Sequence, residues 1–305
     1  MAQTLIFTAD IHLRDSSPKC RTDDFQAAQW DKLAQVVELC RKYDAIWLDA
    51  GDLLHKAYPS LGLIAKTLKV LGHRKIYTLL GNHDMPFHNR SKVWEAGLGV
   101  LIEAGAVGVL GYKPKEISFG GLNYFDVYGW PYGEEFEEKP YRDGINILVH
   151  HGMIFKGRQD AIPGAEGCTA KKFMQQHKDF DLIVCGHNHQ AFEVEVGNRV
   201  LVNVGCLTRQ SADFADHKPR VLLVTGTKGG DFTYDFIQLS AKSGVVSKEH
   251  LAAQAKKEEE LNAFVEGLQG VEEATLSFQK NVDVVMDKTN PSELTRQKVQ
   301  EAIYD

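Results

Sequence analysis

Five short apolar segments of this chain each end in residues that bind metals. The segments have the length and the β-branched or aromatic content of buried strands, and they cover residues 5–8, 45–48, 76–80, 147–149 and 182–184. The residues that follow them are Asp10 and His12, Asp52, Asn82 to Asp84, His150 and His151, and His187 and His189. Since functional residues gather on loops at one end of a sheet, we expect one site assembled from five strand ends.

The chemistry of these residues predicts a metal site. A single His or Asp at a strand end usually marks a solvated loop or a satisfied polar contact, but five coincidences argue against that interpretation. Imidazoles, carboxylates and one amide oxygen form a mixed set of donors that suits manganese, iron or zinc, and no cysteine is among them. The ligands are too many for one ion, so the pattern favours two.

Composition narrows the class of protein. A chain of 305 residues can bury one large domain plus a small appendage. Its five cysteines are odd in number and lack CxxC spacing, which favours reduced thiols in the cytoplasm. No signal peptide and no membrane-spanning stretch is recognisable, so we expect no membrane partner. The net charge of -6 gives no global attraction to nucleic acid, although two divalent cations would neutralise some carboxylates locally.

The order of predicted elements indicates an α/β fold. Helical spacing over residues 22–43, capped by Thr22 or Asp23, and over residues 59–71 makes the opening third alternate between strand and helix, which predicts parallel pairing. Hairpin signals follow at residues 116–128, 192–204 and 220–239. Two packed mixed sheets flanked by helices satisfy both patterns.

The last part of the chain differs in composition. It becomes rich in Lys, Glu, Ala and Gln, so we place a boundary near residue 240, with a catalytic domain at 1–240 and a small α/β capping segment at 241–305. Residues 250–268 predict one helix. Asn290 as cap and Pro291 at the first position predict another that runs to Ile303.

In this order and strand context, the motifs DxH, GD, GNHD, a later His and GHxH resemble the calcineurin-like metallophosphoesterase superfamily over about residues 5 to 210. The resemblance implies an αββα sandwich that holds two divalent ions, with manganese favoured over zinc, iron or magnesium. One ion would be bound by Asp10, His12, Asp52 and His189, and the other by Asp52, Asn82, His150 and His187, with Asp52 as the bridge. Adjacent strand residues point to opposite faces, so only one of His150 and His151 easily reaches the metals. The resemblance favours His150 and leaves His151 to line the substrate pocket.

The resemblance also implies roles for residues that do not bind metal. His83 would contact the phosphate or protonate the leaving oxygen, and Asp84 would orient the His83 ring. A turn or helix cap after Gly81 is the alternative for Asp84.

The segments Gly51-Asp52-Leu53-Leu54-His55 and Gly81-Asn82-His83-Asp84-Met85-Pro86 are similar to the SbcD-like nucleases of DNA repair. In that group the histidine at the position of His55 is implicated in exonuclease chemistry, whereas the alternative is a surface histidine. We expect Arg14 and Arg209 to contact backbone phosphates. Solvated surface charge is the other interpretation of both.

The resemblance implies a two-metal phosphodiesterase that cleaves DNA as an exonuclease or endonuclease by a metal-bridged hydroxide. SbcD-like nucleases work with an SMC-type ATPase, whereas compact phage members of the superfamily stand alone. The alternatives are a phosphomonoesterase acting on nucleotides or phosphoproteins, a nuclease subunit with little activity without its partner, and a binding module that has lost catalysis.

Overall fold

The computed structural model describes residues 3–120, 123–136, 140, 144–160, 164–227, 229–249, 261–263 and 278–304. The chain divides into two compact units, Met1–Ser247 and Lys248–Asp305. Among the described residues of the first unit, the strands form two six-stranded sheets and a two-stranded pair. Among the described residues, no helix is both long enough and apolar enough to span a membrane.

The first sheet contains the strands of the opening third. Its order is β14-β13-β1-β2-β3-β4. The strands are β1 (Thr4–Thr8), β2 (Ile46–Asp49), β3 (Ile76–Thr78), β4 (Val107–Val109), β13 (Arg220–Gly226) and β14 (Phe232–Gln238). β1 to β4 are parallel, as the alternation of strands and helices predicts, and β13 and β14 form the antiparallel hairpin expected at residues 220–239.

The second sheet has the order β11-β12-β10-β7-β6-β5. Its strands are β5 (Lys115–Gly120), β6 (Asn123–Trp130), β7 (Ile145–His151), β10 (Leu182–Gly186), β11 (Phe192–Val196) and β12 (Arg199–Asn203). The two edge pairs, β5 with β6 and β11 with β12, are the remaining predicted hairpins. The four inner strands are parallel to one another. A separate pair joins β8 (Ile154–Phe155) and β9 (Cys168–Thr169).

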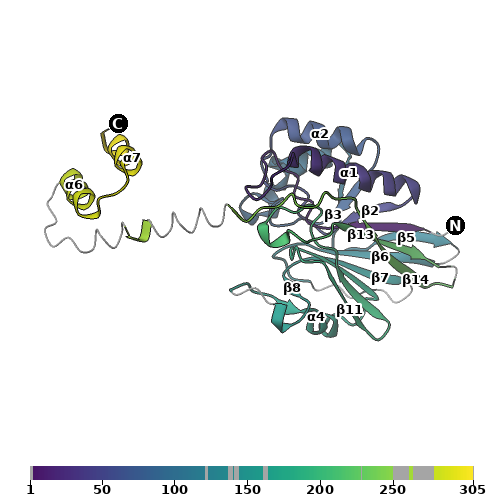
Figure 1. Ribbon diagram of the computed structural model, residues 1–305. Coiled ribbons are helices and arrows are strands. Elements are labelled where there is room, and N and C mark those ends of the chain that lie inside the picture. The colour runs from purple at the N-terminus through teal and green to yellow at the C-terminus, as the bar shows by residue number, and fades with distance from the viewer. Residues whose placement is uncertain are drawn as a thin grey trace. The chain divides into compact units, whose positions relative to one another are not determined.

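Helices cover the outer faces of both sheets in the first unit, so the predicted αββα sandwich is confirmed (Figure 1). The first sheet is covered by α1 (Phe25–Lys42), α2 (Leu61–Leu71) and α3 (Gly97–Glu103), and the second by α4 (Ala170–Gln176). Short 3-10 helices occur at Pro86–His88, Arg90–Glu95, Arg158–Asp160 and Ala212–Phe214.

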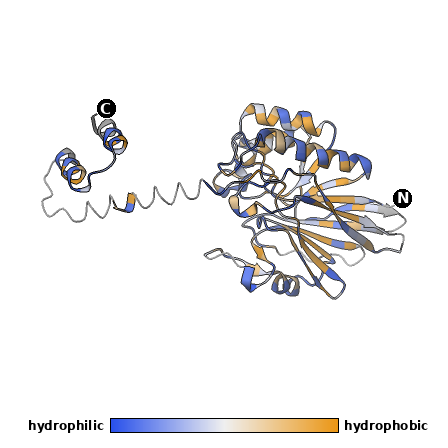
Figure 2. Ribbon diagram, viewed as in Figure 1, coloured by the Kyte–Doolittle hydropathy of each residue, from blue (hydrophilic) through white to orange (hydrophobic). Residues whose placement is uncertain are grey.

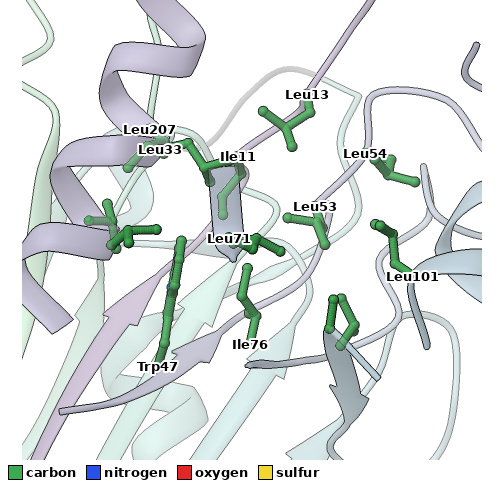
Figure 3. Packing of buried hydrophobic residues seen from close by; sticks show 14 of the residues in the cluster. Ile11, Leu13, Leu33, Trp47, Leu53, Leu54, Leu71, Ile76, Leu101 and Leu207 are labelled. Carbon is green, nitrogen blue, oxygen red and sulfur yellow. The ribbon is translucent and has the colours of Figure 1, made fainter. Parts of the chain in front are cut away.

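Alternating side chains on each strand fill the apolar layers. Leu5 and Phe7 of β1 belong to the layer between the sheets, whereas Ile6 belongs to the layer beneath the helices. Trp47 and Ile76 also face that outer layer, with Leu33 and Leu71 from the helices (Figure 3). Because both faces of the inner strands are covered, most of their sequences contain apolar runs, and Figure 2 shows orange stretches along the sheets of the first unit.

The helix caps differ slightly from those predicted. Asp24, rather than Thr22 or Asp23, accepts a hydrogen bond from the amide of Ala27 at the start of α1. Asp23 is instead paired with Arg21 at 2.7 Å. Ser60 caps α2 through the amide of Leu63. Side-chain oxygens satisfy first-turn amides in both helices.

The first unit extends past residue 240 because the following segment pairs with the loop before α1. Thr22 donates to the carbonyl of Val245 at 3.1 Å, and Ser247 donates to the carbonyl of Cys20 at 2.7 Å. These bonds attach residues 241–247 to the first unit rather than to the expected capping segment.

The second unit contains α6 (Phe278–Thr289) and α7 (Glu293–Tyr304). At the start of α7 the hydroxyl of Ser292, rather than Asn290, accepts a hydrogen bond from the amide of Thr295 at 3.4 Å. Most of the helix predicted at residues 250–268 lies outside the described residues, although residues 261–263 are helical. The capping function of this unit stays a prediction.

A buried carboxylate links three strands of the first sheet near their carboxyl ends. Asp49 of β2 accepts hydrogen bonds from the hydroxyls of Thr8 at 2.6 Å and Thr78 at 2.8 Å and from the amide of Gly51 at 3.2 Å. The indole of Trp47 donates to the Thr8 hydroxyl at 2.9 Å, which directs the Thr8 proton to Asp49. Burial raises the pKa of Asp49 to about 7.

We expect the stability of the metal-free protein to depend on pH through Asp49. The ordinary carboxyl pKa is 3.8 and the folded-state pKa is about 7, so folding favours the protonated form and its contribution is lost as pH rises from about 4 to 7. The difference in unfolding free energy between wild type and Asp49→Asn should therefore fall by roughly 3 kcal/mol across this range. Urea unfolding in EDTA measures this difference in unfolding free energy. The control is Asp179→Asn, which replaces an exposed aspartate. If the unfolding free energy changes equally with pH in all three proteins, Asp49 does not cause the pH dependence.

Candidate metal centre

The strand ends of both sheets bring the predicted metal-binding residues together. Among the described residues, three groups of side chains have ligand atoms within 4.8 Å of one another. They are Asp10 with His12 and His189, Asp52 with His151 and His187, and His12 with His55 and His83. The first two mix carboxylate and imidazole and are therefore the candidate metal groups.

The first group joins the loop after β1 to the loop after β10. The Nε2 atoms of His12 and His189 are 3.0 Å apart, and Oδ1 of Asp10 lies 3.9 Å from the former and 3.8 Å from the latter. The amide of His187 donates to both Asp10 oxygens at 3.0 Å, which holds this carboxylate across the two sheets. Burial lowers the pKa of His12 well below its usual value, so its imidazole is neutral and suited to bind a metal.

The second group lies around Asp52. Oδ2 of Asp52 is 3.4 Å from Nε2 of His151, and Oδ1 of Asn82 is 3.3 Å from the same nitrogen. Burial lowers the pKa of His187 to about 4, so this ring is also neutral. The Asp52 carboxylate raises the pKa of His151 to about 9 although burial opposes the charge.

The donor chemistry at His151 fits a divalent ion. Nδ1 of His151 lies 2.6 Å from the carbonyl oxygen of Ala50, which only accepts, so Nδ1 carries a proton. In the neutral ring, Nε2 then presents a lone pair toward the oxygens of Asp52 and Asn82. Three lone-pair donors that converge in this way repel one another unless a cation or a proton lies between them, and the outer carbonyl fixes the ring as it does in metal sites.

Asp52 lies between the two candidate groups. The oxygen that faces His151 is also 3.6 Å from Nε2 of His12 in the first group. The other oxygen accepts the amide of His83 at 2.9 Å. Its neighbouring imidazoles hold the pKa of Asp52 below the usual range although burial opposes this. One ionised carboxylate oxygen shared by both groups fits the predicted bridging role.

His150 lies away from both candidate groups, which differs from the expectation that it binds metal. Its ring centroid is 4.3 Å from that of Trp130 and 5.0 Å from that of Phe173, in the aromatic layer next to α4. Along β7, Val149 faces the layer between the sheets and Leu148 the outer layer. Alternation then sends His150 outward and His151 inward. His151 therefore takes the position that the resemblance assigned to His150.

Asp84 does not orient the ring of His83. Its carboxylate accepts hydrogen bonds from the backbone amides of Asp52 at 3.0 Å, Leu54 at 3.0 Å and Gly81 at 3.2 Å. Burial, together with the charge of Asp52, raises the pKa of Asp84 well above its ordinary value. The carboxylate thus shapes the loop that carries Asp52, which is closer to the alternative of a turn-forming residue than to a catalytic one.

His83 is oriented by the main chain instead. Its Nδ1 lies 2.8 Å from the carbonyl oxygen of His55, so Nδ1 carries a proton and Nε2 is the atom that can exchange one. The His55 and His83 rings are stacked with centroids 5.4 Å apart, and the ring of His12 lies 4.7 Å from that of His83. Both predicted non-ligand histidines therefore adjoin the first metal group.

The two predicted substrate-binding arginines have different surroundings. Arg14 and His55 line one small cavity, together with Lys56. Arg209 is buried, and its guanidinium donates to the carbonyls of Ala215, at 3.1 Å, and Lys242. This arrangement differs from the expectation that Arg209 contacts a phosphate. The donors of the guanidinium instead hold two backbone segments in place.

The backbone around the site adopts unusual conformations. Asp10, His12, Asp52 and His187 have φ values of 50°, 49°, 58° and 83°, in the left-handed region that L-residues seldom occupy. Such conformations cluster at functional sites, where surrounding contacts enforce them. A Cβ at Gly81 would lie 2.0 Å from Oδ1 of Asp52, so the glycine leaves room for the carboxylate.

Two residues near the site have no counterpart in the sequence motifs. Asp49 organises the strand ends, and a strand-final acidic residue after an apolar run was its one available signal. The ring centroid of Tyr132 lies 5.2 Å from that of His187 and 6.2 Å from that of His151. Tyr132 follows β6, which ends in no metal-binding residue, so nothing in the sequence drew attention to it.

Comparison with known proteins gives one family match. The model of the family described as calcineurin-like phosphoesterase matches residues 4–191. These residues include both candidate metal groups, His83 and His55.

The chain is also similar to several solved structures at low identity. A candidate 5′-nucleotidase from Staphylococcus aureus is 13% identical, with a TM-score of 0.48, over 84% of this chain and 58% of that one. Phosphopantetheinyl hydrolase from Mycobacterium tuberculosis is 15% identical, with a TM-score of 0.45, over 71% and 93%. Vacuolar protein sorting 29 from Cryptosporidium parvum is 15% identical, with a TM-score of 0.35, over 79% and 99%. This chain thus spans little more than half of the Staphylococcus aureus protein.

The geometry predicts opposite outcomes for two adjacent histidines. His151→Ala should lose about one equivalent of bound Mn²⁺, because His151 lies beside Asp52 and Asn82. His150→Phe should retain both equivalents, because the ring it replaces packs among aromatic side chains. Elemental analysis after dialysis against Mn²⁺ measures both. Loss of metal from His150→Phe with retention in His151→Ala would reverse the assignment.

Asp84→Asn should weaken folding and metal binding together. An amide offers one acceptor oxygen, so at least one of the three backbone donors loses its partner, which costs about 1–3 kcal/mol. Urea unfolding and Mn²⁺ titration of the same samples test this. His83→Ala is the matched control and should retain metal. If Asp84→Asn reduces turnover with normal stability and metal affinity, the structural assignment is wrong.

Proposed function

Because the chain belongs to the calcineurin-like phosphoesterase family, we propose that it is an SbcD-like nuclease that hydrolyses the phosphodiester bonds of DNA. The family match and the His and Asp groups make it a metal-dependent phosphoesterase. The nuclease activity, the DNA substrate and the preference for manganese are the proposed refinement.

The observation that carries this proposal is the stacked pair of His55 and His83. Their rings are 5.4 Å apart at an interplanar angle of 25°. Both lie in a group with His12 but without a carboxylate, so neither is needed to complete the two Asp and His groups. Two imidazoles beside a metal centre, and outside its ligand set, are available to the substrate.

The residues present fit two divalent ions, one held by Asp10, His12, Asp52 and His189 and the other by Asp52, Asn82, His151 and His187. Bound there, the ions would act as Lewis acids that activate water and neutralise phosphoryl oxygens. The charged side chains at the centre are buried away from water, where such electrostatic effects are stronger.

His83 is the proton donor in this proposal. Its Nδ1 proton is committed to the carbonyl of His55, so the ring would have to carry a second proton on Nε2, and that proton would pass to the leaving oxygen and leave His83 neutral. Burial, and next the charge of Arg14, lower the pKa of His55 to about 4, so His55 is neutral at physiological pH and would position the substrate by hydrogen bonding.

Arg14 supports an anionic polymer as substrate. The protein has a net charge of -6, so local cations have to supply the attraction to phosphate. Arg14 and Lys56 share a cavity with His55, and Nε of Arg14 is buried without a hydrogen-bond partner in the part of the chain that the structure describes. A phosphate next to the scissile one would meet this guanidinium.

The test compares a small diester with DNA. Wild type with Mn²⁺ should hydrolyse bis-p-nitrophenyl phosphate and end-labelled DNA. His83→Ala should lose 10²-fold or more of both activities, as expected for a general acid. His55→Ala should lose DNA cleavage far more than small-ester hydrolysis. Elemental analysis should show that both variants bind as much metal as the wild-type protein does.

Each contrary outcome is distinct. Turnover of the small ester with intact DNA would contradict the nuclease while leaving the metal-dependent esterase in place. A higher rate on p-nitrophenyl phosphate than on the diester would favour the phosphomonoesterase alternative. Equal loss of metal and activity in His55→Ala would make His55 structural.

A further inference from the structure

A cavity of about 500 Å³ lies beside the metal centre, on a side that the proposed chemistry leaves unused. Its lining includes His88 and Asn89 from the loop after β3, and Tyr132 and Glu134 from the loop after β6. The cavity lined by Arg14 and His55 has a volume of only about 20 Å³. Of these two cavities, only the one on the Tyr132 side has room for a ligand the size of a nucleoside.

Tyr132 connects this cavity to the second metal group. Its ring centroid is 5.2 Å from that of His187, and on the cavity wall it is 5.8 Å from that of His88. The amide of Tyr132 donates to the carbonyl of Leu80 at 3.1 Å, which ties its loop to the end of β3. The half-buried ring thus lines the cavity while it contacts a candidate metal-binding residue.

The cavity walls are held in place before any ligand binds. Glu134 accepts two hydrogen bonds from Nη1 of Arg90, at 3.0 and 2.9 Å, and a third from the hydroxyl of Tyr112. The Arg90 bonds join the two wall loops to each other, and the Tyr112 bond fixes Glu134 further. A preformed cavity loses little conformational freedom on binding, which favours affinity.

The loop after β3 has an enforced conformation. Phe87 and His88 have φ values of 53° and 54°, and such left-handed conformations are rare for bulky residues. Phe87 is 85% exposed, so burial of its own side chain does not explain this shape. The conformation brings His88 to the cavity wall.

We infer that this cavity binds the nucleoside attached to the scissile phosphate, with its base stacked on Tyr132. The inference rests on the proposed phosphodiesterase function and names the part of the substrate that this side recognises. A cavity of this size suits a small organic ligand. Aromatic faces bind bases of any sequence by stacking, and the Asn89 amide and Glu134 carboxylate are polar groups at its edge.

Two p-nitrophenyl diesters separate nucleoside binding from chemistry. Thymidine 5′-p-nitrophenyl phosphate carries a nucleoside, whereas methyl p-nitrophenyl phosphate carries only a methyl group, and both release the same chromophore. In wild type with Mn²⁺, the nucleoside ester should have the lower KM. Tyr132→Leu should raise the KM for the nucleoside ester about ten-fold relative to the methyl ester, as expected for one lost base stack.

Matched variants separate stacking from other effects. Tyr132→Phe keeps the aromatic face and should retain the wild-type KM ratio within about two-fold, as stacking requires. Tyr58→Leu removes a tyrosine that is 58% exposed and does not line the cavity, so it should leave the ratio unchanged. Elemental analysis should show equal Mn²⁺ in all variants. If Tyr132→Leu loses metal, His88→Leu on the same wall replaces it, with a rise in the ratio again expected.

The outcomes also separate this inference from the proposed function. Equal KM values for both esters in wild type, or an equal change in both on substitution at Tyr132, would overturn the nucleoside site while the esterase stands. Hydrolysis of neither ester by metal-loaded wild type would refute the phosphodiesterase function and the inference that rests on it.

Discussion

The buried carboxylates of Asp10, Asp52 and Asp84 place the strongest physical demand on this structure. All three are at most 1% exposed, and isolated charges buried to this degree are costly. Each is compensated differently: Asp10 accepts a backbone amide from the opposite sheet, Asp84 accepts three amides, and Asp52 faces imidazoles. The tight turns and left-handed residues around the centre are the geometry that brings these partners within reach.

The centre also depends on both sheets. Asp10, His12, Asp52 and Asn82 follow strands of the first sheet, whereas His151, His187 and His189 follow or end strands of the second. The apolar layer between the sheets fixes their separation, and with it the spacing of the ligand atoms. Packing far from the site therefore controls the geometry on which metal binding depends, because close-packed interiors transmit small shifts.

Sequence reasoning predicted the architecture well because strand ends, helix spacing and hairpin turns are local signals. The predicted ligand residues come together in the structure except at β7, where His150 and His151 are adjacent. Both faces of β7 are buried, so its continuous apolar sequence does not reveal which residues face the other sheet. The surroundings of Arg209 and Asp84 differ from the expectation because their partners are backbone groups, which no motif encodes. Asp49 and Tyr132 were missed since they act through neighbours that only the fold supplies.

The position of β1 has a consequence for how the chain acquires its structure. β1 pairs with β2 on one side and with β13 on the other, where Thr4 is opposite Thr225. During synthesis the edge of β1 that pairs with β13 therefore stays unpaired until β13 has left the ribosome. His187 and His189 also emerge late, so both candidate ligand sets are complete only after strands of the second sheet have been made. Contacts of such long sequence separation slow folding, and the nascent chain has to be kept from pairing its open edge with other strands.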